Sequence, residues 1–88
     1  MYQKVKNMIS IKLFGLFRQK TENFEFELTA TRLDECLKEL EKASGIPVKD
    51  LKNGVIFVNK IPLEKLKGFK TPLKDGDTIA ILSPVSGG

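Results

Sequence analysis

One long amphipathic segment limits the folds that are open to this chain. Apolar residues recur at helical spacing between Thr31 and Gly45, and they form one continuous stripe made of Leu33, Cys36, Leu37, Leu40 and Ala43. Thr31 is a suitable N-cap with Asp34 three positions later, and Gly45 followed by Pro47 is typical of a helix end. Because this is the one long helix predicted in 88 residues, its stripe has to be buried against a sheet.

Five short segments have the apolar patterns of strands, and their order indicates the fold class. Strands are expected over residues 8–14, 23–28, 55–58, 61–63 and 78–82. The first two predict a hairpin around a loop over 15–22, whereas Pro62 cannot donate to a ladder and marks an edge. The run 55–58 is apolar on both sides, which favours a place inside the sheet.

This order of elements predicts an α+β fold. If the first and last strands lie side by side in the middle, the architecture is a β-grasp, a mixed sheet of four to five strands with one main helix packed on one face. We interpret residues 8–82 as a single domain, preceded by a flexible extension over 1–7 and followed by a flexible tail over 83–88.

Two features of the composition exclude most catalytic sites. The chain has no histidine, and Cys36 is its one cysteine, which excludes a four-ligand zinc site, a Ser–His or Cys–His nucleophile and an internal disulfide. Cys36 lies on the apolar stripe, so a small buried hydrophobe is favoured over a sulfur-handling thiol. Asp75 and Asp77 flank the turn glycine Gly76 and indicate turn chemistry rather than a metal site.

The surface composition argues against two further classes of partner. The net charge is +4, but the lysines are spread over loops and interleaved with acids, so solvated surface is favoured over a nucleic-acid site. No apolar run is long enough to span a bilayer, and no signal-peptide core is present. We therefore expect a cytoplasmic protein with no bound cofactor or metal.

The end of the chain, S-P-V-S-G-G, is the candidate functional segment. Glycine is unfavourable to hold in one conformation, so Gly87 and Gly88 contribute nothing to the stability of the fold. Since the usual catalytic groups are missing, we expect the chain to bring a substrate group to a reaction rather than a catalytic site. A last strand in the centre of the sheet would project this tail from a rigid base.

Several motifs together resemble the MoaD/ThiS family of ubiquitin-like sulfur carriers, over roughly residues 8–88. They are Asn59 after an apolar strand, the run L-K-D-G-D-T-I-A-I over residues 73–81, and the S-P-V-S-G-G end. The approach to the terminal glycines is most similar to the MoaD members, the small subunits of molybdopterin synthase. Ser83 stands where the family often has a second proline, and the lysine-rich loop over 61–69 is longer than expected.

The resemblance implies that the Gly88 carboxylate is the reacting group. A MoeB-like adenylating enzyme of the ubiquitin-activating type would use ATP and magnesium to adenylate it, and a persulfide sulfur donor would convert it to a thiocarboxylate. The tail would then enter a MoaE-like molybdopterin synthase large subunit and donate sulfur in molybdenum cofactor biosynthesis. On this interpretation the chain is non-catalytic alone and acts as the sulfur-donating small subunit of a transferase complex.

The residues before Gly88 have implied roles in threading, and a second set could contact a partner. Gly87 lacks a Cβ and passes a narrow channel, Pro84 and Val85 stiffen the segment, and Ser86 could hydrogen-bond within the channel. The second set exceeds what the first strand needs, and it predicts either a small exposed apolar patch for a partner subunit or core packing under the loop: Phe14, Leu16 and Phe17.

Three alternatives remain open at the level of sequence. A ubiquitin-like modifier would use the same activated Gly88 to form isopeptide bonds with lysines of other proteins. A sulfur carrier of another pathway, for thiamine, cysteine or tRNA thiolation, would share the fold and the Gly-Gly end. A nucleic-acid-binding β-grasp module would bind with steep salt dependence even without its terminal glycines.

Overall fold

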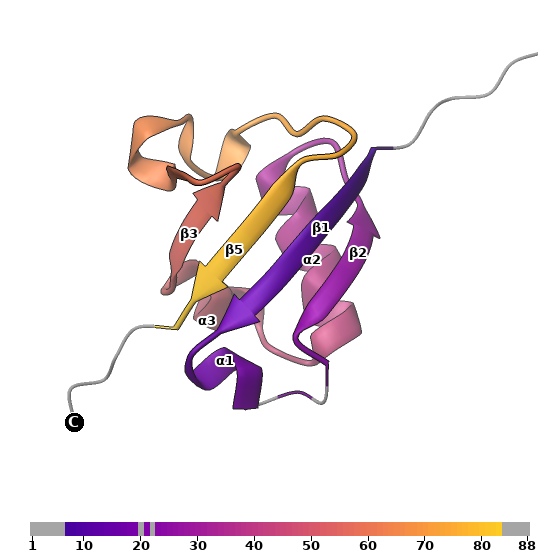
Figure 1. Ribbon diagram of the computed structural model, residues 1–88, viewed down its shortest axis with the longest axis vertical. Helices are drawn as coiled ribbons and strands as arrows, with labels where there is room; N and C mark the ends of the chain where they lie inside the picture. Colours follow the sequence, from indigo (N-terminus) through magenta and orange to yellow (C-terminus); the bar gives the residue numbers. More distant parts are fainter. Residues whose placement is uncertain (1–6, 20, 22, 84–88) are drawn as a thin grey trace, which may run out of the picture.

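A five-stranded mixed sheet forms one layer of the protein, and its helices cover one face of that sheet (Figure 1). The computed structural model describes residues 7–83 except 20 and 22. In chain order the elements are β1 (Met8–Phe14), α1 (Leu16–Gln19), β2 (Glu25–Thr29), α2 (Leu33–Ser44), α3 (Val48–Lys52), β3 (Val55–Val58), β4 (Ile61–Pro62), the 3₁₀ turns η1 (Leu63–Lys65) and η2 (Gly68–Lys70), and β5 (Thr78–Leu82).

The strand order β2-β1-β5-β3-β4 confirms the predicted β-grasp. β1 and β5 pair in parallel at the centre of the sheet, with Ser10 opposite Thr78 and Phe14 opposite Leu82. The predicted β1–β2 hairpin is antiparallel, and β3 pairs antiparallel with both β5 and β4. Because β1 and β5 are parallel, their C-terminal ends lie side by side at the same end of the sheet.

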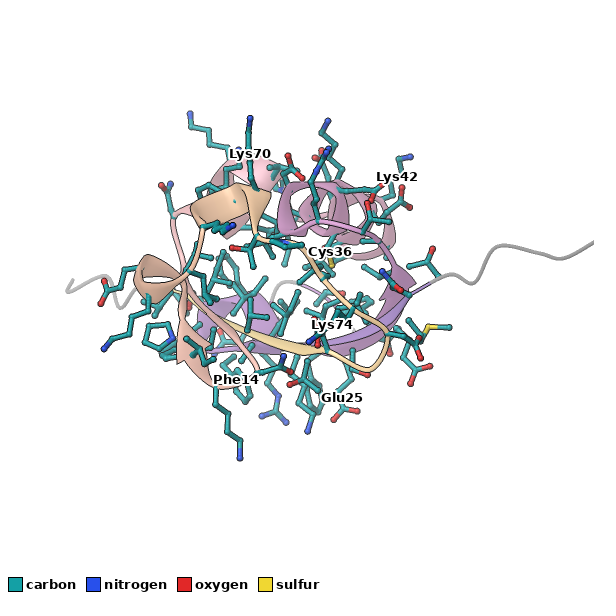
Figure 2. All side chains as sticks on the ribbon, turned by 90° about the horizontal axis from the view of Figure 1, so that it is seen from above. Phe14, Glu25, Cys36, Lys42, Lys70 and Lys74 are labelled. Carbon is teal, nitrogen blue, oxygen red and sulfur yellow. The ribbon has the colours of Figure 1, made fainter. Side chains whose placement is uncertain are left out.

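The core lies between α2 and the sheet. The predicted stripe of α2 is buried at Leu33, Cys36, Leu37 and Leu40, and Cys36 lies between helix and sheet in Figure 2. The prediction was wrong for Ala43, which is exposed. Gly45 adopts a left-handed conformation with φ of 81°, which ends the helix as predicted and turns the buried Ile46 into the core instead.

The start of α2 also differs from the prediction. Its N-cap is Arg32, with no capping side chain, and the amide of Leu33 donates to the carbonyl of Thr71 at 3.0 Å. Thr31 lies one residue earlier, where its amide and hydroxyl both donate to Glu35, at 2.7 and 2.8 Å. A backbone contact from a distant loop therefore satisfies the donor that a local cap was expected to satisfy.

Two connections predicted as loops contain short helices. α1 lies in the β1–β2 connection, and η1 and η2 lie between β4 and β5. The β3–β4 turn is tight, because Asn59 and Lys60 have positive φ angles of 53° and 70°, the pattern of a two-residue hairpin turn. None of the helices in the described part of the chain is long and apolar enough to cross a membrane.

Candidate functional site

The structure places the base of the predicted reactive segment. Gly88 and the residues before it, Gly87, Ser86, Val85 and Pro84, lie outside the described residues, so their predicted roles stay predictions. β5 ends at Leu82 in the centre of the sheet, directly opposite Phe14 at the end of β1. The tail therefore begins where the two central strands, β1 and β5, both end (Figure 1).

Ser83 belongs to the folded domain, although the sequence placed it in the flexible tail. Its exposed fraction is only 5%, and its amide donates to the carbonyl of Phe14 at 3.3 Å. Its hydroxyl oxygen accepts a hydrogen bond from the amide of Leu16, the first residue of α1, at 2.6 Å. The hydroxyl thus satisfies one of the free donors at the start of a helix that lies 67 residues earlier in the chain.

The uncovered face of the sheet carries a row of apolar side chains beside this point. Val55 pairs with Leu82, and Leu82 pairs with Phe14, so the three residues cross β3, β5 and β1 in one line. Their exposed fractions are 46%, 41% and 39%. We call these three residues the apolar row. It lies next to the C-terminal end of β5, from which the tail begins.

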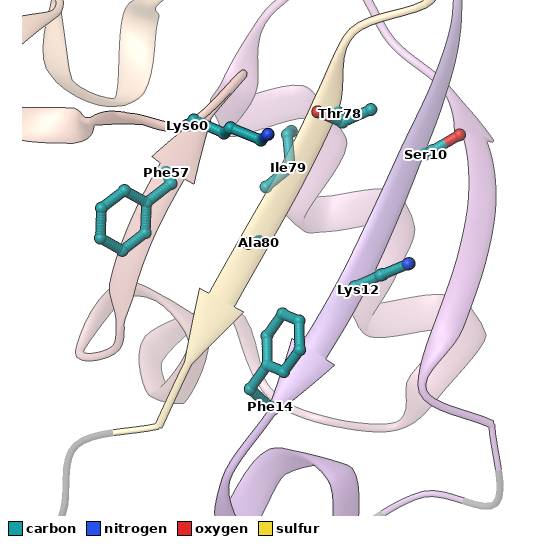
Figure 3. A pocket seen from close by; sticks show the side chains of 8 residues that line it. All are labelled: Ser10, Lys12, Phe14, Phe57, Lys60, Thr78, Ile79 and Ala80. Atoms are coloured by element: carbon teal, nitrogen blue, oxygen red, sulfur yellow. The ribbon is translucent and has the colours of Figure 1, made fainter.

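A groove of about 480 Å³ lies on the same face, next to the apolar row (Figure 3). Phe57 on β3 and Phe14 on β1 lie on either side of Ala80, which is opposite both Phe57 and Lys12 in the ladders. The hollow exists because Ala80 has a small side chain between two aromatic ones. Lys12 and Lys60 also line it, so the groove combines an apolar floor with two cationic groups.

The polar half of the same face lies farther from the tail. Lys12 is opposite Glu25 on β2, and the two side chains form an exposed ion pair at 3.8 Å. Ser10 is opposite Thr78 on one side and Glu27 on the other. The open face is therefore apolar near the end of β5 and polar toward its beginning.

Only two of the three residues of the predicted partner patch are exposed. Phe14 and Leu16 are exposed, with fractions of 39% and 46%, as a partner surface requires. Phe17 is only 3% exposed and belongs to the core, because α1 turns its ring inward. A Cβ on Gly54 would lie 2.8 Å from the Phe17 ring, so a glycine at position 54 makes room for it.

Sequence reasoning missed four residues of this face: Val55, Phe57, Ala80 and Leu82. The signal was present, since the run 55–58 is apolar on both sides. The place inside the sheet that this pattern favours is confirmed by the strand order β5-β3-β4, but only Ile56 and Val58 are buried. The apolar residues on the other side of β3 form part of an open surface.

Cys36 cannot act as a nucleophile in the folded state. The side chain is fully buried, and this burial, with smaller contributions from Glu35 and Glu39, raises the pKa of the thiol to about 12. The prediction of a small buried hydrophobe is thereby confirmed. Among the described residues, no group of three or more metal-ligating side chains gathers.

A parallel pair of first and last strands, flanked by hairpins and covered by one main helix, defines a ubiquitin-like β-grasp protein. The ThiS family matches residues 11–88, nearly the whole chain. The chain belongs to this family, whose members are ubiquitin-like sulfur carriers of the ThiS/MoaD type. The resemblance seen in the sequence is thus confirmed.

Several solved structures are similar to this chain. The small archaeal modifier protein 1 of Methanosarcina acetivorans is 26% identical, with a TM-score of 0.81, and the match covers 97% of this chain and 100% of that one. A chain in the complex of subunits 1 and 2 of the molybdopterin-converting factor of Helicobacter pylori is 31% identical, with a TM-score of 0.67 and coverage of 92% and 99%.

A chain in the BexX/CysO complex of Amycolatopsis orientalis is 22% identical, with a TM-score of 0.73 and coverage of 91% and 99%, and this likeness shows the fold alone. No curated protein matches the chain. Two of these three structures are complexes with a second protein.

Proposed function

We propose that this chain carries sulfur on its Gly88 carboxylate as the small subunit of a molybdopterin synthase. The observation that carries the proposal is the position of Ser83, from which the tail starts. Ser83 is held at the end of the central strand, and the apolar row and the groove lie beside it. A partner that docks on this face would find the reactive end within reach of its own active site.

The chemistry follows from the properties of a terminal carboxylate. An α-carboxyl group has a pKa of roughly 3.5, so at neutral pH it is ionised and a poor electrophile. Its oxygen would attack the α-phosphorus of ATP and release pyrophosphate. A persulfide sulfur would then attack the acyl carbon of Gly88 and expel AMP. A thiol would cleave the resulting sulfur–sulfur bond, becoming oxidised to a disulfide and leaving the thiocarboxylate.

The partners provide what this chain does not. ATP and magnesium belong to the adenylating enzyme, and the pterin precursor belongs to the large subunit of the synthase. The groove favours a partner segment with an apolar side chain over Ala80 and an acidic group near Lys12 and Lys60, because those two cations line it. Gly87 and Ser86 would then pass through the partner's channel, with Val85 and Pro84 as the stiffer lead-in.

Mass spectrometry of the intact chain tests the proposal. The protein is incubated with ATP, magnesium, its adenylating enzyme and a persulfide donor, and a chain without Gly88 is the control. We expect the wild-type chain to gain the mass that separates sulfur from oxygen, and the control to gain none. Absence of this gain in the wild-type chain, with an adenylating enzyme that is active on its own carrier, contradicts the proposal.

The pathway is tested separately by adding the large subunit and a pterin precursor. Sulfur transfer to the pterin supports the molybdopterin assignment. A thiocarboxylate that forms but reacts only with acceptors for thiamine, cysteine or tRNA thiolation would assign the chain to another carrier pathway.

A second function is favoured by one comparison. The similarity to the small archaeal modifier protein 1 extends over the whole of that chain. A modifier would form an amide between Gly88 and a lysine of another protein. Affinity purification separates the two functions. Covalent ladders that persist under denaturing conditions indicate a modifier, and a free thiocarboxylate with a stoichiometric partner recovered under native conditions indicates a carrier.

A further inference from the structure

We propose that Ser83 is a positioning residue for the reaction at Gly88, because its hydroxyl fixes the point at which the tail leaves the domain. The inference rests on the proposed function, since it gives Ser83 a role in delivering Gly88. Five residues separate Ser83 from the end of the chain, so an extended tail spans at most roughly 17 Å from this base. With so short a tail, the position of its base decides where Gly88 arrives.

The base is tied to two elements at once. The amide of Ser83 donates to Phe14, which extends the parallel β1–β5 pairing by one residue. Its hydroxyl accepts from the amide of Leu16 at 2.6 Å, which links the end of β5 to the start of α1. α1 is in turn anchored by the buried ring of Phe17. Ser83 is therefore attached to a fixed part of the domain rather than to a free loop.

Gly15 leaves the space that this contact needs. Its φ is +70°, and a Cβ built on it would lie 2.5 Å from the hydroxyl oxygen of Ser83. The same Cβ would approach the Leu82 side chain at 3.4 Å. A side chain at position 15 would thus displace Ser83, so the glycine and the serine form one local arrangement. A residue that is 5% exposed, whose amide is bonded to β1 and whose hydroxyl is bonded to α1, is not typical of a tail.

The contacts of Ser83 also connect the start of the tail to the apolar row. Leu82 and Phe14 of the apolar row are the direct chain neighbour and the ladder neighbour of Ser83. A partner that contacts the apolar row therefore meets a tail whose origin has a fixed distance from that row. Without the hydroxyl contact, the partner would have to order the base of the tail itself while threading it.

This loss can be expressed as a change in rate. Ordering one backbone residue changes an equilibrium by roughly 5- to 30-fold. We expect Ser83→Ala to lower kcat/KM for adenylation of Gly88 by about 10-fold. The affinity of the adenylating enzyme for the domain, measured with chains that lack Gly88, should change much less, because the docking face itself is intact.

The experiment compares Ser83→Ala with Ser83→Thr and with Ser44→Ala. Ser83→Thr keeps the hydroxyl and should stay within about twofold of the wild type. Ser44 is the matched control: its hydroxyl donates to the carbonyl of Leu40 and accepts from the amide of Ile46, at the C-terminal end of α2 and away from β1, β5 and α1 in these contacts. Ser44→Ala should lower stability without changing adenylation. Hydrogen exchange in the isolated domain should show faster exchange of the Leu16 amide in Ser83→Ala alone.

A double-mutant cycle with Gly15→Ala provides the second test. Gly15→Ala should reproduce the adenylation defect, and its effect should be smaller in the Ser83→Ala background, where the clashing oxygen is gone. Unchanged adenylation by Ser83→Ala, or an equal loss in Ser44→Ala, overturns the positioning role while leaving the proposed function intact. A wild-type chain that is never adenylated overturns the proposed function and this inference together.

Discussion

Substitution of Phe14 by alanine tests whether the apolar row is the docking surface. Phe14 has an exposed fraction of 39%, and a phenylalanine offers roughly 200 Å² of surface, so about 80 Å² is available to a partner. At about 25 cal/mol per Å², covering this surface contributes about 2 kcal/mol to binding. We therefore expect Phe14→Ala to weaken binding of the adenylating enzyme by about 30-fold.

Isothermal titration calorimetry with the purified enzyme measures this change, and the chain offers a matched control. Met8 lies on the same face of the same strand, at the opposite end from the tail, and it is also exposed, with a fraction of 44%. Met8→Ala should change the Kd by less than about twofold, because it removes apolar surface outside the apolar row. Leu82→Ala, inside the row, should behave like Phe14→Ala.

Two results would refute the reasoning. Binding of Phe14→Ala at wild-type strength would show that the apolar row is not covered in the complex. An equal loss in Met8→Ala would show that binding responds to apolar surface anywhere on β1. Urea unfolding of each variant confirms that the chain used in the titration is folded.

Two further predictions concern the stability of the folded domain. Asp77→Ala removes the acceptor for the Lys74 amide, at 2.7 Å, and for the Asn59 side chain, at 3.0 Å, and should lower the free energy of unfolding by about 2–3 kcal/mol in urea. Asp75→Ala removes one exposed bond and should lower it by less than about 1 kcal/mol, so equal losses would contradict this interpretation of the turn. The pKa of Cys36 lies above its ordinary value of 9.0, at about 12, so the stability that its thiol contributes is present below pH 9.0 and is lost as the pH rises toward 12. The wild type should lose up to about 1.4 kcal/mol per pH unit more than Cys36→Ala across this window, and parallel profiles of the two proteins would rule the effect out.

The secondary structure was largely predictable because its signals are local. The predicted features that the structure confirms depend on residues a few positions apart: the stripe of α2, the glycine that ends it and the β1–β2 hairpin. The errors arose where a distant segment supplied the partner. Thr71 satisfies the first amide of α2, and the chain after Gly45 brings Ile46 into the core in place of Ala43.

The apolar row was less predictable, because alternation within a strand tells only which residues share a side. Val55, Leu82 and Phe14 become neighbours through two ladders, one of which joins strands separated by most of the chain. The register of those ladders decides that apolar residues meet near the tail and polar ones meet at the opposite end. Nothing in a local pattern contains that register.

The sequence by itself determined the fold class, the family and the expected reactive end, since these depend on periodicity, on absent residue types and on the glycines that close the chain. Only the tertiary structure decided where the tail starts and what surrounds it. The parallel pairing of the first and last strands brings Phe14, Leu16 and Ser83 together, and the contacts between them convert a residue that looked like flexible tail into part of the folded domain.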